Sequence, residues 1–313
     1  MSDQHNTPNR DDIRKKIEQE LASGGKSADK QKRRPQRSQN RQRPDSKPYI
    51  NKKLQRNPQG IRPGKRPPMG IMTTTLWEYP SQHYDASNST MQGSKDYIGA
   101  TPSWVIYQLL KRYTKENDTV IDPMCGSGTT IDVCKDLNRK PIAFDLNPQR
   151  PDIKKNDSRK LPLEDDSVDF AFIDPPYSTH VDYSDDDRCI GKLDAGQKPE
   201  HDDEIMGHDY YEAMDSVLAE LYRVLKPGKH LGLYVSDSWK KKKGGQPGEG
   251  TFMPIGFELF AMMSQAFTPV DIICVVRHNT KLQRGNWHKA AEEENFFLRG
   301  FNYLLIMKKP NND

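Results

Sequence analysis

The chain has 313 residues, of which 33% are hydrophobic and 29% charged, and its formal net charge is +4 at neutral pH. This length suits one sizeable domain with additional segments. Because there is no run of about eighteen apolar residues and no charged-then-apolar leader, membrane-spanning classes are excluded and we expect a cytoplasmic protein.

The four cysteines are scattered and form no Cys-x-x-Cys pair; they are Cys125, Cys134, Cys189 and Cys274. This pattern predicts neither structural zinc nor a disulfide framework. In the connection 277–299, neither His278 nor His288 has metal-ligand spacing to a second ligand, so we expect no metal site.

The charge is distributed unevenly. Residues 1–70 contain 19 Lys/Arg and 7 Asp/Glu, whereas residues 71–313 contain 29 and 37. The first segment is also poor in branched apolar and aromatic residues, which predicts a disordered basic tail, with at most a short helix at 10–21. Such a tail is either a tether for nucleic acid or a solubilising segment.

The body of the chain alternates strand-like and helix-like segments. Thr101-Pro102-Ser103 predicts a capped helix start, and the apolar spacing from Val105 to Tyr113 predicts a helix with one buried face. Short apolar runs predict strands over 119–122, 141–145 and 168–173, with a short element from Ile153. This alternation is typical of an α/β fold with a parallel sheet, so we expect one domain over residues 71–313.

The second half continues the alternation. We expect a polar insertion over 178–208, helices over 209–225 and 255–266, and strands over 230–235, 270–276 and 301–307. Pro227-Gly228 should end the first of these helices. Two connections carry basic residues: 239–245 is predicted to be a flexible loop, either contacting phosphate or simply solvated. The other, 277–299, interleaves basic and aromatic residues and is either a nucleic-acid contact or an extended hairpin.

Several acids follow the predicted strands. Ligands of parallel sheets bind beyond the carboxyl ends of the strands, so we expect one acidic rim there. Its members are Asp122, Asp145, Asp157 and Asp174.

The stretch Asp122-Pro123-Met124-Cys125-Gly126-Ser127-Gly128-Thr129-Thr130 predicts a glycine turn that opens a helix. Ile131 stands where a dinucleotide fingerprint needs its third glycine, and no Gly-Lys-Ser/Thr follows for phosphate. A carboxylate at Asp122 favours a cationic group, Asp145 is placed for ribose hydroxyls, and Asp157 could accept from an adenine amino group. These features indicate S-adenosylmethionine as the ligand.

A second turn, Asp174-Pro175-Pro176-Tyr177, follows the apolar run 168–173. Asp174 and a neighbouring carbonyl offer acceptors only, which suits an exocyclic amino group that brings donors. The prolines fix φ, and Tyr177 offers a flat face for stacking on a base.

Together the two turns resemble the cofactor and catalytic motifs of the DNA amino-methyltransferases that modify adenine N6 or cytosine N4. The resemblance covers about residues 100–310 and implies the class I, Rossmann-like, seven-stranded methyltransferase fold. It implies that Asp174, Pro175, Pro176 and Tyr177 hold and stack the target base. The cofactor-binding residues would be Asp122, Pro123, Cys125, Gly126, Ser127, Gly128, Thr129, Asp145, Leu146 and Asp157.

Three functions stay open. DNA amino methylation is the first, but no separate segment of about a hundred residues is available to recognise a DNA sequence, so an RNA methyltransferase acting on a base amino group, such as guanine N2 in tRNA, is the second. A non-catalytic nucleic-acid-binding protein is the third. C5 methylation of cytosine is not favoured, because Cys125 lies in the cofactor turn and no Pro-Cys pair exists.

Overall fold

The computed structural model describes residues 69–85, 91–94, 97, 99–179, 181, 183–198, 206–241, 250–278, 287–294 and 296–311. The chain divides into two units, Met1–Gly60 and Ile61–Asp313, and all described residues belong to the second. The predicted tail and its short helix at 10–21 therefore lie outside the described residues, apart from Met69 and Gly70. None of the helices in these ranges has both the length and the apolar character needed to cross a membrane.

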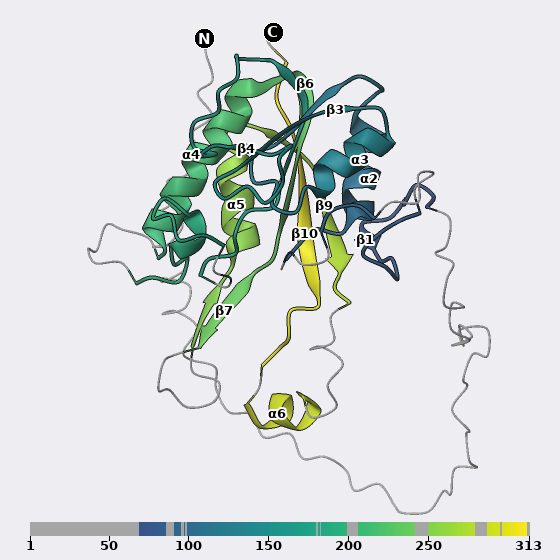
Figure 1. The fold of residues 1–313 in the computed structure, drawn as a ribbon. Helices are drawn as coiled ribbons and strands as arrows, with labels where there is room; N and C mark the ends of the chain where they lie inside the picture. Colours follow the sequence, from purple (N-terminus) through teal and green to yellow (C-terminus); the bar gives the residue numbers. More distant parts are fainter. Residues whose placement is uncertain are drawn as a thin grey trace, which may run out of the picture. The chain divides into compact units, whose positions relative to one another are not determined.

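A single large sheet forms the centre of the second unit (Figure 1). Its strands lie side by side in the order β1-β9-β10-β6-β5-β2-β3-β4. They are β1 (Leu76–Trp77), β2 (Thr119–Asp122), β3 (Lys140–Asp145), β4 (Lys154–Lys155), β5 (Val168–Ile173), β6 (Leu225–Val235), β9 (Thr268–Val276) and β10 (Phe301–Lys308). Only β10 runs antiparallel to its neighbours β6 and β9. The seven-stranded α/β fold predicted from the sequence is thus confirmed, and β1 adds a short parallel edge beside β9.

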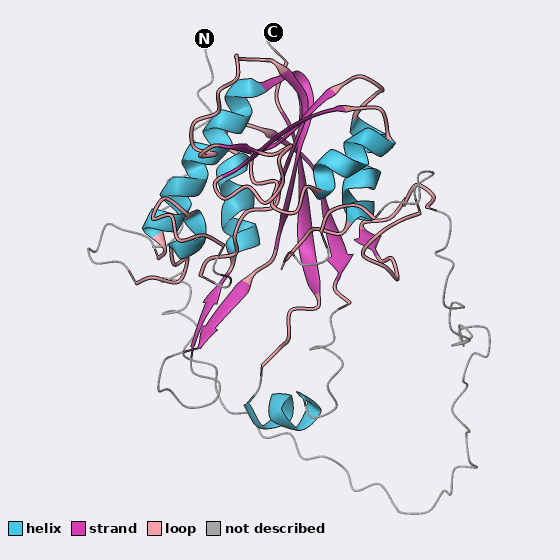
Figure 2. Cartoon of the chain, in the orientation of Figure 1, coloured by secondary structure: helices cyan, strands magenta, loops and turns pink. Residues whose placement is uncertain are grey.

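Helices cover both faces of the sheet, with α4 and α5 on one side and α2 and α3 on the other (Figures 1 and 2). The helices are α2 (Ser103–Tyr113), α3 (Thr129–Asp136), α4 (His208–Val224), α5 (Ile255–Met263) and α6 (Trp287–Glu294), with a 3₁₀ turn η2 (Ile190–Lys192). Alternation along β5 explains the two layers, because successive side chains point to opposite faces. Phe170 and Phe172 pack in the cluster of α2, whereas Ala171 and Ile173 pack in the cluster of α4 and α5.

Three local expectations differ from the structure. The first helix begins at Ser103, and the Thr101 side chain does not cap it. Helix α4 ends at Val224, and Pro227 and Gly228 lie inside the early part of β6 instead of stopping the helix. The predicted loop after Asp237 begins as a strand, β7 (Ser238–Lys241), which pairs antiparallel with β8 (Gly250–Met253).

The strand order fixes where the acids gather. Strands β5, β2, β3 and β4 are consecutive neighbours and pair in parallel, so their carboxyl ends share one edge. Asp122 ends β2 and Asp145 ends β3, while Asp174 directly follows β5. The edge also receives the first residues of β10, because that strand runs in the opposite direction.

The fold predicts a large effect at Leu109 of α2, which is fully buried and packs close to Gly232 of the sheet. Leu109→Ala should lower the free energy of unfolding by about 2–5 kcal/mol, because it leaves a cavity between helix and sheet. Leu76→Ala is the matched control, since Leu76 is 62% exposed and its loss should change stability by less than about 0.5 kcal/mol. Urea unfolding followed by circular dichroism measures both; similar small losses would contradict this packing.

Candidate functional site

A hollow of about 580 Å³, open solvent included, lies at the carboxyl ends of β2, β3, β4 and β5. We call it the rim pocket. It is lined by Tyr97, Pro123, Met124, Asp145, Leu146, Asn147, Asn156, Asp157, Ser158, Asp174, Pro176, Tyr183, Ser184, Arg188, Cys189 and Ile190. The structure therefore brings together six of the residues predicted from sequence. They are Pro123, Asp145, Leu146, Asp157, Asp174 and Pro176.

The glycine turn lies behind this lining. Gly126 and Gly128 have φ values of 48° and 80°, in the left-handed region that favours glycine. A Cβ at Gly126 would meet the ring of Tyr97, and one at Gly128 would meet the guanidinium of Arg150. Both glycines thus make room for side chains of the chain itself, and neither lines the rim pocket.

Arg150 secures the turn, although no sequence pattern pointed to it. Its guanidinium donates to both carboxylate oxygens of Asp132, at 2.8 and 2.9 Å. It also donates to the carbonyls of Ser127 and Gly128, at 3.3 and 3.2 Å. The start of α3 is therefore held to the loop after β3.

The remaining predicted residues of the turn are internal. Cys125 is buried, which raises the pKa of its thiol well above the ordinary value. The hydroxyls of Ser127 and Thr129, both buried, hydrogen-bond each other at 2.8 Å. These three side chains shape the turn from inside.

Asp122 is buried within the turn and does not line the rim pocket. Its carboxylate accepts hydrogen bonds from the Met124 N–H and the Thr130 hydroxyl. Burial raises the pKa of Asp122 to about 7, and the two hydrogen bonds oppose the rise. Asp122 was expected on the rim with the other three acids, but its carboxylate instead accepts hydrogen bonds from the turn that follows it.

Asp145 and Asp157 face the rim pocket. Asp145 accepts the backbone N–H groups of Gly126 and Asn147, each at 2.8 Å, and so joins the glycine turn to the end of β3. Asp157 is paired with the Arg159 guanidinium at 2.7 Å. Burial opposes ionisation of Asp157, but the hydrogen bonds from Arg159 outweigh it and lower the pKa.

The second turn is centred on Asp174, whose two carboxylate oxygens each accept a hydroxyl hydrogen. Tyr177 donates to Oδ1 at 2.7 Å, and Thr101 donates to Oδ2. Burial raises the pKa of Asp174 to about 7, against the lowering effect of these hydroxyls and of the Arg277 charge. Thr101, which the sequence indicated as a helix cap, therefore contacts the Asp174–Tyr177 turn instead.

The turn is braced from behind by α4 and by the insertion. The buried hydroxyl of Tyr210 donates to the Pro176 carbonyl at 2.7 Å. Ser178 is buried with φ 62°, an uncommon conformation for a non-glycine residue. Its hydroxyl accepts the Ala195 N–H at 3.0 Å and donates to Asp194, which forms an ion pair with Lys240 of β7. The strained conformation gave no signal in the sequence.

A second hollow, which we call the Tyr177 pocket, adjoins the rim pocket. Its lining includes Tyr79, Pro80, Ser81, Gln82, His83, Ser94, Tyr97, Gly99, Ala100, Thr101, Pro102, Trp104, Tyr177, Tyr234, Val276, Arg277, His278 and Asn302. Tyr97 lines both hollows. Asp174 lines the first, and the two residues whose hydroxyls donate to it, Thr101 and Tyr177, line the second. The Asp174–Tyr177 turn therefore lies between two hollows.

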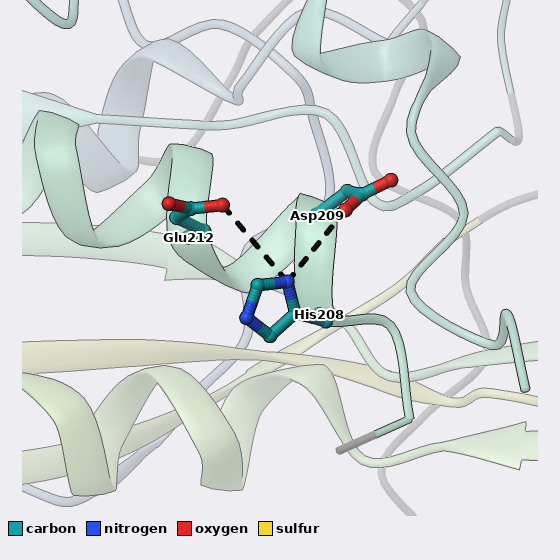
Figure 3. Close-up of side chains that lie close together, drawn as sticks. All are labelled: His208, Asp209 and Glu212. Carbon is teal, nitrogen blue, oxygen red and sulfur yellow. Dashed lines mark ion pairs between the residues drawn. The ribbon is translucent and has the colours of Figure 1, made fainter. Parts of the chain in front are cut away.

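One exposed cluster of side chains contains residue types that bind metal cations. His208, Asp209 and Glu212 lie together at the start of α4, with the histidine Nδ1 at 3.6 and 3.9 Å from the two carboxylates (Figure 3). All three side chains are exposed. Asp209 in the first turn interacts favourably with the helix dipole, and exposed acidic groups of this kind are common without a bound ion.

The burial of Asp122 predicts a pH effect on stability. Its pKa is raised from 3.8 to about 7, so the folded state binds a proton that the unfolded state has released. This contribution to stability is fully present below about pH 4 and is lost as the pH rises through 7, by about 4 kcal/mol.

Asp122→Asn should show a smaller fall in unfolding free energy between about pH 3 and about pH 8 in urea titrations, a range that spans the two pKa values of 3.8 and about 7. Asp209→Asn, with a 63% exposed side chain, is the control and should retain the wild-type dependence. An unchanged slope in Asp122→Asn would contradict the assignment.

Known proteins match the chain over different lengths. A type II methyltransferase of Haemophilus parainfluenzae, M.HpaI, is 31% identical over 86 residues, which cover 28% of this chain and 26% of that protein. The type II methyltransferase M1.MboII of Moraxella bovis is 30% identical over 80 residues, or 26% of this chain and 31% of that one. The matched segments thus span less than a third of these relatives.

Solved structures with similar folds include the [4+2]-cyclase SpnF, at 15% identity and a TM-score of 0.42, covering 71% of this chain and 88% of that one. A SAM-dependent methyltransferase from Methanosarcina mazei shares 14% identity with a TM-score of 0.40, covering 65% and 98%. The family model described as DNA methylase matches residues 6–156 and 168–313, nearly the whole chain. The chain therefore belongs to the DNA methylase family.

Proposed function

We propose that this protein transfers a methyl group from S-adenosylmethionine to the exocyclic amino group of a base in DNA, at adenine N6 or cytosine N4. The observation that carries the proposal is the position of the Asp174–Tyr177 turn between the rim pocket and the Tyr177 pocket. A donor and an acceptor can then approach the same carboxylate from two sides. Membership in the DNA methylase family favours DNA over RNA as the acceptor.

The rim pocket fits the proposed cofactor by its chemistry. Carboxylates of Asp145, Asp157 and Asp174 line it together with the apolar side chains of Leu146 and Met124. Acceptor oxygens suit ribose hydroxyls and a cationic centre, whereas they would repel phosphates. We assign the ribose to Asp145 and the adenine to the segment around Asp157.

The glycine turn would hold the methionine part of the cofactor, and the shape of its backbone is what suits it to this role. Pro123 lines the rim pocket, and the buried groups of the turn keep its backbone in place behind it. These groups are Asp122, Cys125, Gly126, Ser127, Gly128 and Thr129. Arg150 holds the same turn from outside.

S-adenosylmethionine, when bound, supplies an electrophilic methyl group. The chain's own contribution is to hold the amino nitrogen and to accept its hydrogens. The Pro175 carbonyl accepts no hydrogen bond from the described residues, and Asp174 presents an oxygen-rich edge beside it. Tyr177 lines the pocket that would receive an extruded base, so its ring can stack on that base.

The raised pKa of Asp174 matters for the proton that the nitrogen loses. A carboxylate with a pKa of about 7 is a better proton acceptor than an exposed one. Two hydroxyl donors keep it oriented and limit the rise, so that the ionised form persists near neutral pH. No covalent enzyme intermediate is required, and the buried Cys125 thiol takes no part.

The first prediction from this mechanism concerns Asp174. Asp174→Ala should reduce tritiated methyl transfer to DNA by at least about a hundredfold, since general acid–base contributions are of this size or larger. S-adenosylmethionine binding measured by calorimetry should persist.

Asp209→Ala removes an exposed acid of α4 and is the matched control. Digestion of the labelled DNA to nucleosides, with mass measurement, identifies the methylated base. Label appearing in tRNA but not in DNA would overturn the proposed acceptor.

We further propose a two-part organisation, with a disordered basic tail over 1–70 and a methyltransferase domain over 71–313. The tail's excess of Lys/Arg over Asp/Glu supports a role as a nucleic-acid tether. Deleting residues 1–60 should weaken DNA affinity and reduce its dependence on salt, while cofactor affinity stays the same. Binding isotherms at several salt concentrations would detect this, and an unaltered salt slope would exclude the tether.

A further inference from the structure

A buried side-chain amide next to Tyr177 has one polar atom without a hydrogen-bond partner among the described residues. Asn302 of β10 is 5% exposed and lines the Tyr177 pocket. Its Nδ2 donates to the Tyr177 hydroxyl at 3.3 Å, but its Oδ1 is buried and has no hydrogen-bond partner among the described residues. Buried acceptors in native proteins nearly always accept a hydrogen bond, so we expect a ligand to supply the donor for this atom.

The direction of the amide follows from its neighbours. An ionised Asp174 can only accept, so the Tyr177 hydroxyl must give its hydrogen to the carboxylate. The tyrosine oxygen then accepts from the amide nitrogen of Asn302. The carbonyl end of Asn302 is therefore left as an acceptor, with the amide orientation set by this chain of bonds.

Neighbouring polar groups do not supply the missing donor. The guanidinium of Arg277 donates to Ser236 Oγ at 3.5 Å, and the Ser236 hydroxyl donates to the Asp237 carbonyl. Both oxygens of Asp174 already accept hydroxyl hydrogens. The Pro175 carbonyl and Asn302 Oδ1 both accept no hydrogen bond from the described residues at this edge.

An exocyclic amino group offers only hydrogen-bond donors, so it can approach Asp174 and also donate to an unused acceptor nearby. We propose that Asn302 is a specificity-determining residue whose Oδ1 accepts a hydrogen bond from the amino group of a base in the Tyr177 pocket. The ligand class is an amino-bearing base, adenine or cytosine. A base with a carbonyl at that position, such as thymine, would place its oxygen lone pairs against those of Asn302 Oδ1, and the two acceptors would repel each other.

This assignment rests on the proposed function, because it deepens the account of the acceptor site. It also makes a claim about binding alone. Methyl transfer is not needed to test it, so failure of the two ideas can be told apart.

The probes are DNA duplexes with one unpaired residue, because an unpaired base leaves the helix most easily. That residue is 2′-deoxyadenosine, 2′-deoxycytidine, thymidine or 2′-deoxynebularine, which is deoxyadenosine without its amino group. Affinity is measured by fluorescence anisotropy with S-adenosylhomocysteine present. Wild-type protein should bind the deoxyadenosine or the deoxycytidine duplex about 3- to 10-fold more tightly than the thymidine duplex, and an adenine preference should vanish with deoxynebularine.

Asn302→Leu should reduce this ratio to near one, and Asn302→Asp, which keeps an acceptor, should restore most of it. Gln108→Leu is the matched control, because Gln108 is a buried carboxamide whose two ends are both hydrogen-bonded, to the Met72 N–H and the Gly70 carbonyl. It should lower the melting temperature and keep the ratio.

A wild-type ratio near one, or an unchanged ratio in folded Asn302→Leu, would overturn the inference. An intact ratio without methyl transfer to any nucleic acid would instead refute the proposed function.

Discussion

The structure depends on how a half-buried carboxylate is held at the end of a central strand. Burying a charged group costs free energy, because the group loses its hydration. If the oxygens of Asp174 had no hydrogen-bond partners, nothing would compensate for that loss. Thr101 and Tyr177 supply the compensating hydrogen bonds from two different parts of the chain. The segment before α2 and the turn after β5 are thereby fixed to each other.

The same constraint explains the acid-rich edge. Burial raises the pKa of a carboxylate because it disfavours the charged form, and a cation beside the carboxylate opposes the rise. At this edge the Arg159 guanidinium pairs with Asp157 and lowers its pKa. Asp174 keeps a raised pKa because burial outweighs its two hydroxyl donors, and it lines the pocket proposed for the methyl donor.

The sequence predicted helices α2 to α5 and the strands of the large sheet other than β1, because apolar periodicity is a local property, but it missed β1, β7, β8 and α6. It also predicted the edge where the ligands would lie, since parallel strands bring their carboxyl ends together. It did not predict the inward position of Asp122 or the contact of Thr101 with Asp174, which depend on side-chain directions between distant segments. The position of Asn302 beside Tyr177 was not predicted either. A single polar residue inside a strand shows no sequence pattern that distinguishes a ligand contact from packing.

The antiparallel strand β10 has a consequence for how the protein is made. It lies between β6 and β9, although it follows both in the chain. During synthesis the long β6 therefore keeps an open side until β10 emerges and inserts. An unpaired strand edge can pair with other chains, so this interval is the period when the nascent protein is most prone to aggregate and most dependent on chaperones.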